Sequence, residues 1–318
     1  MIPGEKNVPR KAEVAVLIPC YNEVATVGRV VADFHACLPD ARIYVYDNNS
    51  TDETAHLAAA AGAIVVPEKR QGKGFVLQSM LADVDADYYI LVDGDGTYPA
   101  DKAQELLQPV IDGKADMVVG VRLNQYVEQS FRPFHVFGNR LVVALVNRLF
   151  GARLRDIMSG YRAFNRRFAE SVPIVSKGFE IETELTLQAL YRDMVLAEIP
   201  VPYGRRPEGS FSKLSTLRDG ARVLVKIVDI LKAYRPLLFF SLVGGVIGGL
   251  GLLVGAIPIV EFFQTGKVLH FPSAILAAAM EIVAAVCVGW GLVMDSINHH
   301  FKELANLLLK TRRKDNNR

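Results

Sequence analysis

The sequence has few cysteines and lacks the two best-known loops that bind nucleotides. Its 318 residues include only three cysteines, Cys20, Cys37 and Cys287. They form neither an even disulfide set nor a metal-ligand spacing, which favours a reducing compartment. The chain contains no G-x-x-x-x-G-K-[ST] loop and no G-x-G-x-x-G loop. We therefore expect neither a P-loop protein nor a dinucleotide-binding protein.

The sequence also lacks a dominant charge and a secretory signal at its start. Lysine and arginine number 36 against 34 acidic residues, a net charge of +2 that says little about partners, and no nucleic acid is expected among them. Residues 1–13 are polar and carry Lys6, Arg10 and Lys11, unlike a signal peptide. The first domain is therefore expected to fold in the cytoplasm.

Short apolar runs alternate with helical patterns over the first 120 residues. Strands are predicted at 14–19, 42–46, 64–66, 88–92 and 117–121, and helices at 26–38, at 52–61 and in a segment that ends at Leu81. This order predicts an α/β fold with a doubly wound, mostly parallel sheet and ligands at the carboxyl ends of its strands. The polar clusters of the sequence follow these strands.

Two carboxylates end the fourth predicted strand. Side chains repeat every second residue along a strand, so Asp93 and Asp95 share one face, and Gly94 leaves room between them. Converging carboxylates repel each other unless a cation lies there, and hard oxygen ligands suit Mg²⁺ or Mn²⁺, which would bind a diphosphate. The alternative is a polar turn that caps the next helix.

Two more polar clusters follow the second and third predicted strands. Asp47 or Asn48 can hydrogen-bond a base or ribose, while Arg70 and Lys73 on a Gly-flanked loop can neutralise phosphates. The alternatives are an ordinary turn residue at Asn48 and a solvated connection at the loop.

Taken in order, these motifs resemble the family 2 glycosyltransferases with the GT-A fold. The motifs are Pro19-Cys20-Tyr21-Asn22-Glu23, Asp47-Asn48-Asn49-Ser50-Thr51-Asp52, Arg70-Gln71-Gly72-Lys73-Gly74 and Asp93-Gly94-Asp95. Within the family, residues 14–213 are most similar to the polyprenyl-phosphate glycosyltransferases, which include dolichyl-phosphate mannose synthase and bacterial undecaprenyl-phosphate glucosyltransferases. The sequence departs from many relatives at Asn48, where they have Asp, and at Thr97, where they have Gln.

The resemblance implies a role for each matched residue. The nucleoside would contact Pro19, Tyr21, Glu23, Asp47 and Asn48. The diphosphate would contact Arg70 and Lys73, and the metal would be held by Asp93 and Asp95. The full expected nucleotide-sugar site adds Gly94, Arg122 and Glu182, although acids at the start of a helix such as Glu182 also suit the helix dipole.

The acceptor side is expected in the middle of the chain. Asp156-Ile157-Met158-Ser159-Gly160-Tyr161-Arg162 is similar to the family's D-x-x-S-G-[FY]-[RK] segment, and residues 205–213 to its R-x-x-G-x-S-K loop. The alternatives are a helix capped by Ser159 and a basic linker. Residues 123–135 are expected to form a lid, or else to be disordered. The expected catalytic residues are Asp95, Asp156 and Arg206, and the expected acceptor-phosphate ligands are Arg162, Arg206, Ser210, Ser212 and Lys213.

Long uncharged runs in the last third of the chain predict two transmembrane helices. They cover 236–260 and 271–294, the second broken by Glu281, which would mark a subunit contact or the lipid path. We expect a glycosyltransferase domain at 1–213, an amphipathic interface helix at 214–235, the two spans within 236–296 and a cytoplasmic helix with a basic tail at 297–318. Basic residues precede the first span and follow the second, whereas the loop between them has only Lys267. This bias predicts a protein of the cytoplasmic membrane with both termini in the cytoplasm. Paired glycines in the first span favour a homo-oligomer.

Together these features predict an inverting, metal-dependent transfer of a sugar to a polyprenyl phosphate. The donor would be a UDP-sugar, with GDP-mannose as the alternative. A processive polysaccharide synthase is the second enzyme hypothesis, although its Q-x-x-R-W segment is absent. A non-catalytic membrane scaffold or nucleotide-sugar sensor is the hypothesis from another class.

Overall fold

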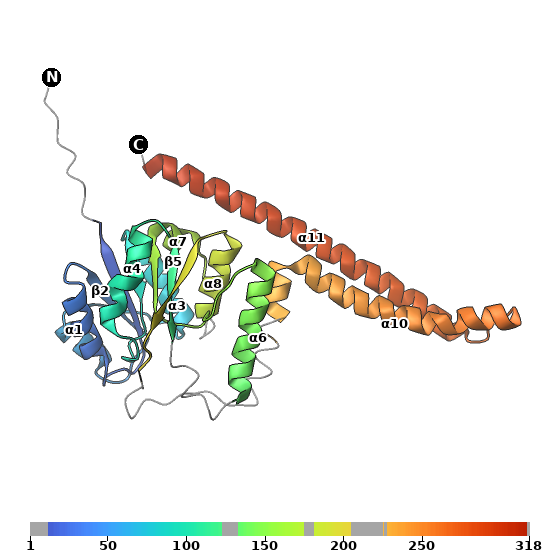
Figure 1. The fold of residues 1–318 in the computed structure, drawn as a ribbon, viewed down its shortest axis with the longest axis horizontal. Coiled ribbons are helices and arrows are strands. Elements are labelled where there is room, and N and C mark those ends of the chain that lie inside the picture. The colour runs from blue at the N-terminus through green and yellow to red at the C-terminus, as the bar shows by residue number, and fades with distance from the viewer. Residues whose placement is uncertain (1–11, 123–132, 175–180, 205–224, 226–227, 317–318) are drawn as a thin grey trace, which may run out of the picture. The chain divides into compact units, whose positions relative to one another are not determined.

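The computed structural model describes residues 12–122, 133–174, 181–204, 225 and 228–316. The chain divides into two compact units, Met1–Thr216 and Leu217–Arg318. The first unit contains a sheet between two layers of helices, and the second consists of long helices (Figure 1).

The first unit is built on a seven-stranded sheet with the order β3-β2-β1-β4-β6-β5-β7 among the described residues. Only β6 runs antiparallel to its neighbours, β4 and β5, and the other pairs are parallel. The strands are β1 (Val14–Cys20), β2 (Arg42–Asp47), β3 (Ile64–Pro67), β4 (Tyr88–Leu91), β5 (Met117–Arg122), β6 (Arg162–Asn165) and β7 (Leu196–Val201). The predicted mostly parallel α/β sheet is confirmed.

Helices cover both faces of this sheet because its strands are apolar on both sides. In β1, Val16 and Ile18 pack into one core and Ala15 and Leu17 into the other, as the two-residue period of a strand requires. The first core is closed by α1 (Val27–Cys37), α2 (Thr54–Ala60), η1 (Ala100–Lys102) and α4 (Ala103–Ile111), and the second by α3 (Lys73–Asp83), α7 (Arg166–Ser171) and α8 (Ile181–Tyr191).

Six elements of this unit were not predicted. They are η1, α4, α6 (Pro133–Phe150), β6, α7 and β7. Since β7 lies at an edge of the sheet, its Pro200 is tolerated. The alternative that Ser159 caps a helix is wrong, because the chain continues from this loop into β6. Of the expected lid, 123–132 lie outside the described residues, and His135 belongs to α6.

The second unit contains the helices α10 (Pro236–Thr265) and α11 (Phe271–Asn316), which include the two predicted spans. Both are long and apolar enough to cross a membrane. Only 17% and 11% of their most apolar 18-residue stretches are buried within this chain, whereas the core helix of a soluble protein is mostly buried. Of the expected interface helix, Val225 and residues 228–234 are described, and they are helical. The helix expected from residue 297 onward is part of α11, which extends to Asn316.

Glycines of α10 bring it close to α11. A Cβ added to Gly244 would lie 2.9 Å from the carbonyl oxygen of Ala284, and one added to Gly251 would lie 2.8 Å from Oε1 of Glu281. A Cβ added to Gly245 would have no such atom within 4 Å. Only the glycines on the α11 side are therefore required by this contact.

We predict that Gly244→Ala lowers the stability of the helix pair, whereas the adjacent Gly245→Ala does not. Both substitutions gain the same helix propensity, so their difference isolates the contact with Ala284. Overpacking of this kind costs about 1–3 kcal/mol. Thermal unfolding of the detergent-purified chain, followed by far-UV circular dichroism, measures the difference. Equal midpoints for the two variants would contradict this packing.

Candidate active site

The loops after β1 and β2 are bound to each other at the carboxyl end of the sheet. The register pairs Cys20 with Asp47. The amide of Asn22 donates to Oγ of Ser50 at 2.9 Å, and Thr51 returns a bond from its amide to Oδ1 of Asn22 at 2.8 Å. Asn22 has φ 55°, a left-handed conformation that asparagine tolerates well. The two loops expected to hold a nucleoside therefore form one connected rim.

One carboxylate oxygen of Asp47 is left for a ligand to bind. Its Oδ2 accepts a hydrogen bond from the amide of Ser50 at 3.3 Å. Its Oδ1 is buried and has no hydrogen-bond partner among the described residues. Such an atom is costly unless a ligand donates to it. Of the other expected nucleoside contacts, Pro19 is the second-last residue of β1, and Tyr21, which follows the strand, is 40% exposed.

Asn48 has a role different from the expected one. Its Nδ2 donates to the carbonyl oxygens of Glu68 and Arg70 at 3.0 and 2.8 Å, and its Oδ1 accepts from the amide of Gly72 at 2.8 Å. The amide side chain is thus engaged in holding the β3–α3 loop. The expectation that Asn48 faces the nucleoside is corrected: Asn48 positions the loop that carries Arg70 and Lys73.

Arg70 lies on this loop in a bidentate pair with Glu68. Nε and Nη2 of Arg70 donate to the two carboxylate oxygens at 3.0 and 2.9 Å. These bonds, with one from Ser79, lower the pKa of Glu68 to about 2. Half of the Arg70 side chain remains exposed, so it can still meet an anion from solvent.

Cys20 is a buried cysteine whose surroundings include several acids. Burial raises the pKa of its thiol, and four nearby carboxylates raise it further. These are Glu23, Asp47, Asp93 and Asp95. A Cβ at Gly94 would collide with Sγ of Cys20. On that side, the room that we expected Gly94 to leave for a ligand is therefore filled by the thiol.

Asp95 is buried and oriented by its own turn. Its Oδ1 accepts from the hydroxyl of Thr97 at 2.6 Å and from the Thr97 amide at 3.1 Å. Thr97 therefore orients this carboxylate.

Asp93 is bound to a lysine from another loop. Nζ of Lys73 lies 2.5 Å from Oδ1 of Asp93 and 2.5 Å from Oε1 of Glu182, which is on the first turn of α8. Burial disfavours the charge on Lys73, but the two carboxylates outweigh it and raise the pKa of the ammonium. A Cβ at Gly160 would collide with the Asp93 carboxylate. The fold thus brings together three predicted site residues and the glycine of the Ser159-Gly160-Tyr161 segment.

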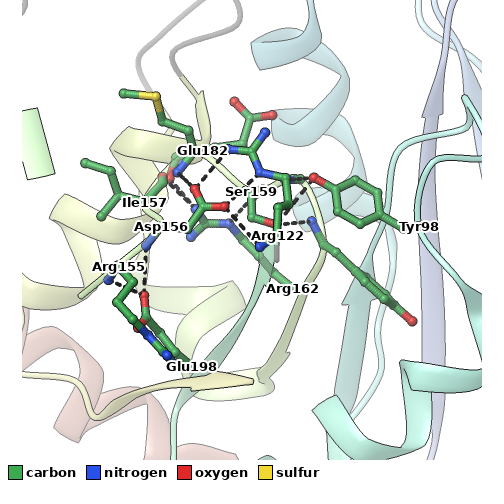
Figure 2. A network of polar contacts seen from close by, with 12 residues as sticks. Tyr98, Arg122, Arg155, Asp156, Ile157, Ser159, Arg162, Glu182 and Glu198 are labelled. Atoms are coloured by element: carbon green, nitrogen blue, oxygen red, sulfur yellow. Dashed lines mark hydrogen bonds and ion pairs between the residues drawn. The ribbon is translucent and has the colours of Figure 1, made fainter. Parts of the chain in front are cut away.

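Arg122 and Asp156 form a second buried pair (Figure 2). Nε and Nη2 of Arg122 donate to the two oxygens of Asp156 at 2.7 and 2.9 Å. Burial opposes ionisation of Asp156, yet these bonds hold its pKa below the ordinary value. Arg122 also lies over the ring of Tyr203, 5.6 Å from its centroid.

Sequence reasoning missed Glu198, which supports this pair from β7. One of its oxygens accepts from the amides of Arg155 and Asp156 at 2.7 and 3.0 Å, and the other from Nε of Arg155 at 3.2 Å (Figure 2). A single acid inside the otherwise uncharged strand Leu196–Val201 was the available signal.

Arg162 is part of the fold and does not reach an acceptor phosphate. Its side chain is fully buried, and burial lowers its pKa to about 10. All of its guanidinium nitrogens are engaged, so the expected phosphate contact is corrected. The bonds run from Nε to the Ser159 carbonyl, from Nη1 to Met117 and Thr186, and from Nη2 to the carbonyls of Ile157 and Glu182.

The other expected acceptor ligands, Arg206, Ser210, Ser212 and Lys213, lie outside the described residues. Gly204 is the last described residue before these ligands, and its amide donates to the carbonyl oxygen of Thr97 at 2.9 Å. Gly204 is therefore bound to a residue two positions after Asp95.

Comparison with known proteins identifies the family. The model of the family "Glycosyl transferase family 2" matches residues 15–172. Glycosyltransferase AglJ of Haloferax volcanii is 32% identical over 293 residues, which cover 91% of this chain and 95% of AglJ. The chain belongs to the family 2 glycosyltransferases.

Two further similarities concern the glycosyltransferase domain. A dolichyl-phosphate hexose transferase of Haloferax volcanii is 28% identical, with 69% of this chain and 93% of the relative covered. The GT-A fold is shared with glucosyl-3-phosphoglycerate synthase of Mycobacterium tuberculosis, solved with Mn²⁺, UDP-glucose and phosphoglyceric acid. That structure has a TM-score of 0.56 and 23% identity, and the match covers 70% of this chain and 79% of the other.

The acids of this glycosyltransferase fit a divalent cation only if the substrate completes its ligands. The described residues contain no group of three or more His, Cys, Asp or Glu side chains that could hold a metal alone. Mg²⁺ is often bound by one or two carboxylates together with water and substrate phosphates. Asp93 and Asp95 are two such carboxylates, and Asp93 is paired with the Lys73 ammonium.

We predict that Arg162→Met destabilises the glycosyltransferase by about 3–5 kcal/mol, since buried carbonyls and a hydroxyl lose their donors. Arg162→Lys should also be destabilised, because three donors cannot replace five. Arg153→Met, at an exposed arginine of the preceding loop, is the matched control. Chemical denaturation of the three variants gives the comparison, and a stability of Arg162→Met equal to that of the control would contradict a structural role.

We also predict that Gly94→Ala destabilises the protein and that Cys20→Ala rescues it in the double variant. The added methyl collides with Sγ of Cys20, and removing that sulfur removes the collision. Thermal unfolding midpoints of the four proteins in the cycle measure the coupling. If Gly94→Ala lowered the unfolding midpoint equally in the wild type and in Cys20→Ala, the collision with the sulfur would not be the cause of the destabilisation.

Proposed function

We propose that this glycosyltransferase transfers one sugar from a nucleotide sugar to the phosphate of a polyprenyl phosphate at a membrane surface. One observation carries the proposal: a family 2 glycosyltransferase domain is followed in the same chain by two apolar helices with exposed large side chains. A soluble acceptor would not require those helices. The similarity to a dolichyl-phosphate hexose transferase supports a lipid phosphate as acceptor.

The proposed donor site is the rim formed by the loops after β1, β2 and β3. The buried oxygen of Asp47 would accept a bond from the nucleoside, and Arg70 and Lys73 would face the diphosphate. We favour a UDP-sugar, with GDP-mannose as the alternative. An Mg²⁺ or Mn²⁺ ion on Asp93 and Asp95 would stabilise negative charge on the departing diphosphate.

The proposed reaction is a single displacement that inverts the anomeric carbon. A phosphate monoester is anionic near neutral pH, so the attacking oxygen needs no strong general base. The lowered pKa of Asp156 supports this, because a carboxylate held ionised by Arg122 is a weak proton acceptor. Asp156 would instead position the Arg122 guanidinium, whose positive charge would balance negative charge in the site.

The acceptor phosphate is proposed to bind Arg206, Ser210, Ser212 and Lys213. The bond between Gly204 and Thr97 supports this proposal, because it anchors the start of that loop beside Asp95. We further propose that α10 and α11 span the cytoplasmic membrane, with both termini in the cytoplasm and the chains forming a homo-oligomer.

We predict that Asp95→Asn abolishes sugar transfer, with a loss of at least about 100-fold, while the chain still folds, because one carboxylate of the cation site is lost. The assay incubates the detergent-purified protein with labelled UDP- and GDP-sugars, Mn²⁺ and polyprenyl phosphate, and measures label in the lipid extract. Asp101→Asn, an exposed acid outside the site, is the control and should retain activity.

The products separate the hypotheses. A lipid with a single labelled sugar supports the proposal, and a growing polymer would support the polysaccharide synthase. Nucleotide binding without any product would support the sensor. Full activity of Asp95→Asn would contradict the role given to this carboxylate.

A further inference from the structure

Lys73 occupies a position that a divalent cation would need. Its ammonium lies 2.5 Å from Oδ1 of Asp93, and its side chain is only 14% exposed. Asp93 is one of the two carboxylates proposed to hold the metal. Two positive centres on one carboxylate oxygen repel each other at this range. A divalent cation can therefore be coordinated by this oxygen of Asp93 only after the Lys73 ammonium has moved away.

The backbone of Lys73 is fixed, so such a movement is confined to its side chain. Lys73 is the first residue of α3, and the preceding Gly72 has φ 136° and donates its amide to Asn48. Asn48 also holds the carbonyls of Glu68 and Arg70. The flexible four-carbon stem remains free to rotate about its own bonds.

Glu182 keeps the ammonium charged and close to the site. Its Oε1 is 2.5 Å from Nζ of Lys73, and its side chain is only 9% exposed. The backbone of Glu182 is held in turn, because its carbonyl oxygen accepts from Nη2 of Arg162 at 2.7 Å. A lysine released from Asp93 therefore retains one carboxylate partner on a rigid helix.

From this geometry we propose that Lys73 is a resident counter-ion which must be drawn off Asp93 before a divalent cation binds there. An incoming nucleotide diphosphate supplies the competing anion. Metal and nucleotide therefore bind as a cooperative pair, and the free enzyme has little affinity for the metal alone. By linkage, each ligand strengthens the other by the same factor. This inference rests on the proposed metal site.

The experiment measures Mn²⁺ binding by electron paramagnetic resonance, in detergent-purified full-length protein, with and without UDP. In the wild type, UDP should tighten Mn²⁺ binding by at least about tenfold, within the usual range of coupling between sites. Lys73→Gln should bind Mn²⁺ alone several-fold more tightly than the wild type, and UDP should then change the Mn²⁺ affinity less.

Two control variants keep the result interpretable. Lys69→Gln removes the same charge from an exposed position on the same loop and should bind Mn²⁺ as the wild type does. Lys73→Arg keeps the charge and should retain weak binding of Mn²⁺ alone. Circular dichroism reports whether each variant is folded, and Lys73→Arg tests the proposal independently if Lys73→Gln is not.

The outcomes distinguish this inference from the proposed function. If the wild type binds no Mn²⁺ even with UDP, the metal assignment fails and the inference fails with it. If the wild type binds Mn²⁺ with UDP but Lys73→Gln binds Mn²⁺ alone no more tightly than the wild type, the counter-ion role is overturned and the metal site stands. Tighter Mn²⁺ binding by Lys69→Gln would also overturn the counter-ion role of Lys73. Loss of any positive charge near the site would then be enough to strengthen Mn²⁺ binding.

Discussion

The structure depends on how negative charge is balanced at the carboxyl end of its parallel strands. Parallel strands bring the residues that follow them to one edge of the sheet, and here those residues include Asp47, Asp93 and Asp95. Buried carboxylates must be paired or hydrogen-bonded. The chain meets this need with Lys73 from the start of α3 and with Thr97 from the turn itself. We propose that a cation and the phosphates of the donor bind at these same acids.

Arginines stabilise the rest of the site without contacting the donor rim. Arg162 holds the carbonyl of Glu182 and so positions the helix whose carboxylate contacts Lys73. Arg122 holds Asp156, whose amide is held by Glu198 on the edge strand β7. Contacts between residues far apart in the sequence therefore connect the end of the sheet to α8. This arrangement favours a rigid site in which only long side chains such as Lys73 move.

The sequence predicted local features well and long-range partners poorly. Strands β1 to β5 follow from apolar runs, and Asp93, Lys73 and Glu182 were named from motifs, but their meeting depends on the folded sheet. Arg162 is the clearest example of what the sequence could not predict. Its motif suggested a phosphate ligand, and only its burial in the folded protein shows that it has a structural role. Strands β6 and β7 were missed because each is short or half-polar and pairs with distant strands. No local pattern encodes such pairing.

The central claim is that the acids at the end of β4 hold a cation which binds the diphosphate of the donor. A structure of the full-length protein determined with UDP and Mn²⁺ tests it most directly. The account predicts electron density for the ion about 2.1 Å from oxygens of Asp93 and Asp95, with the Lys73 ammonium turned from Asp93 toward the phosphates. UDP bound elsewhere, or bound at this rim with Lys73 still on Asp93 and no ion beside it, would contradict the account.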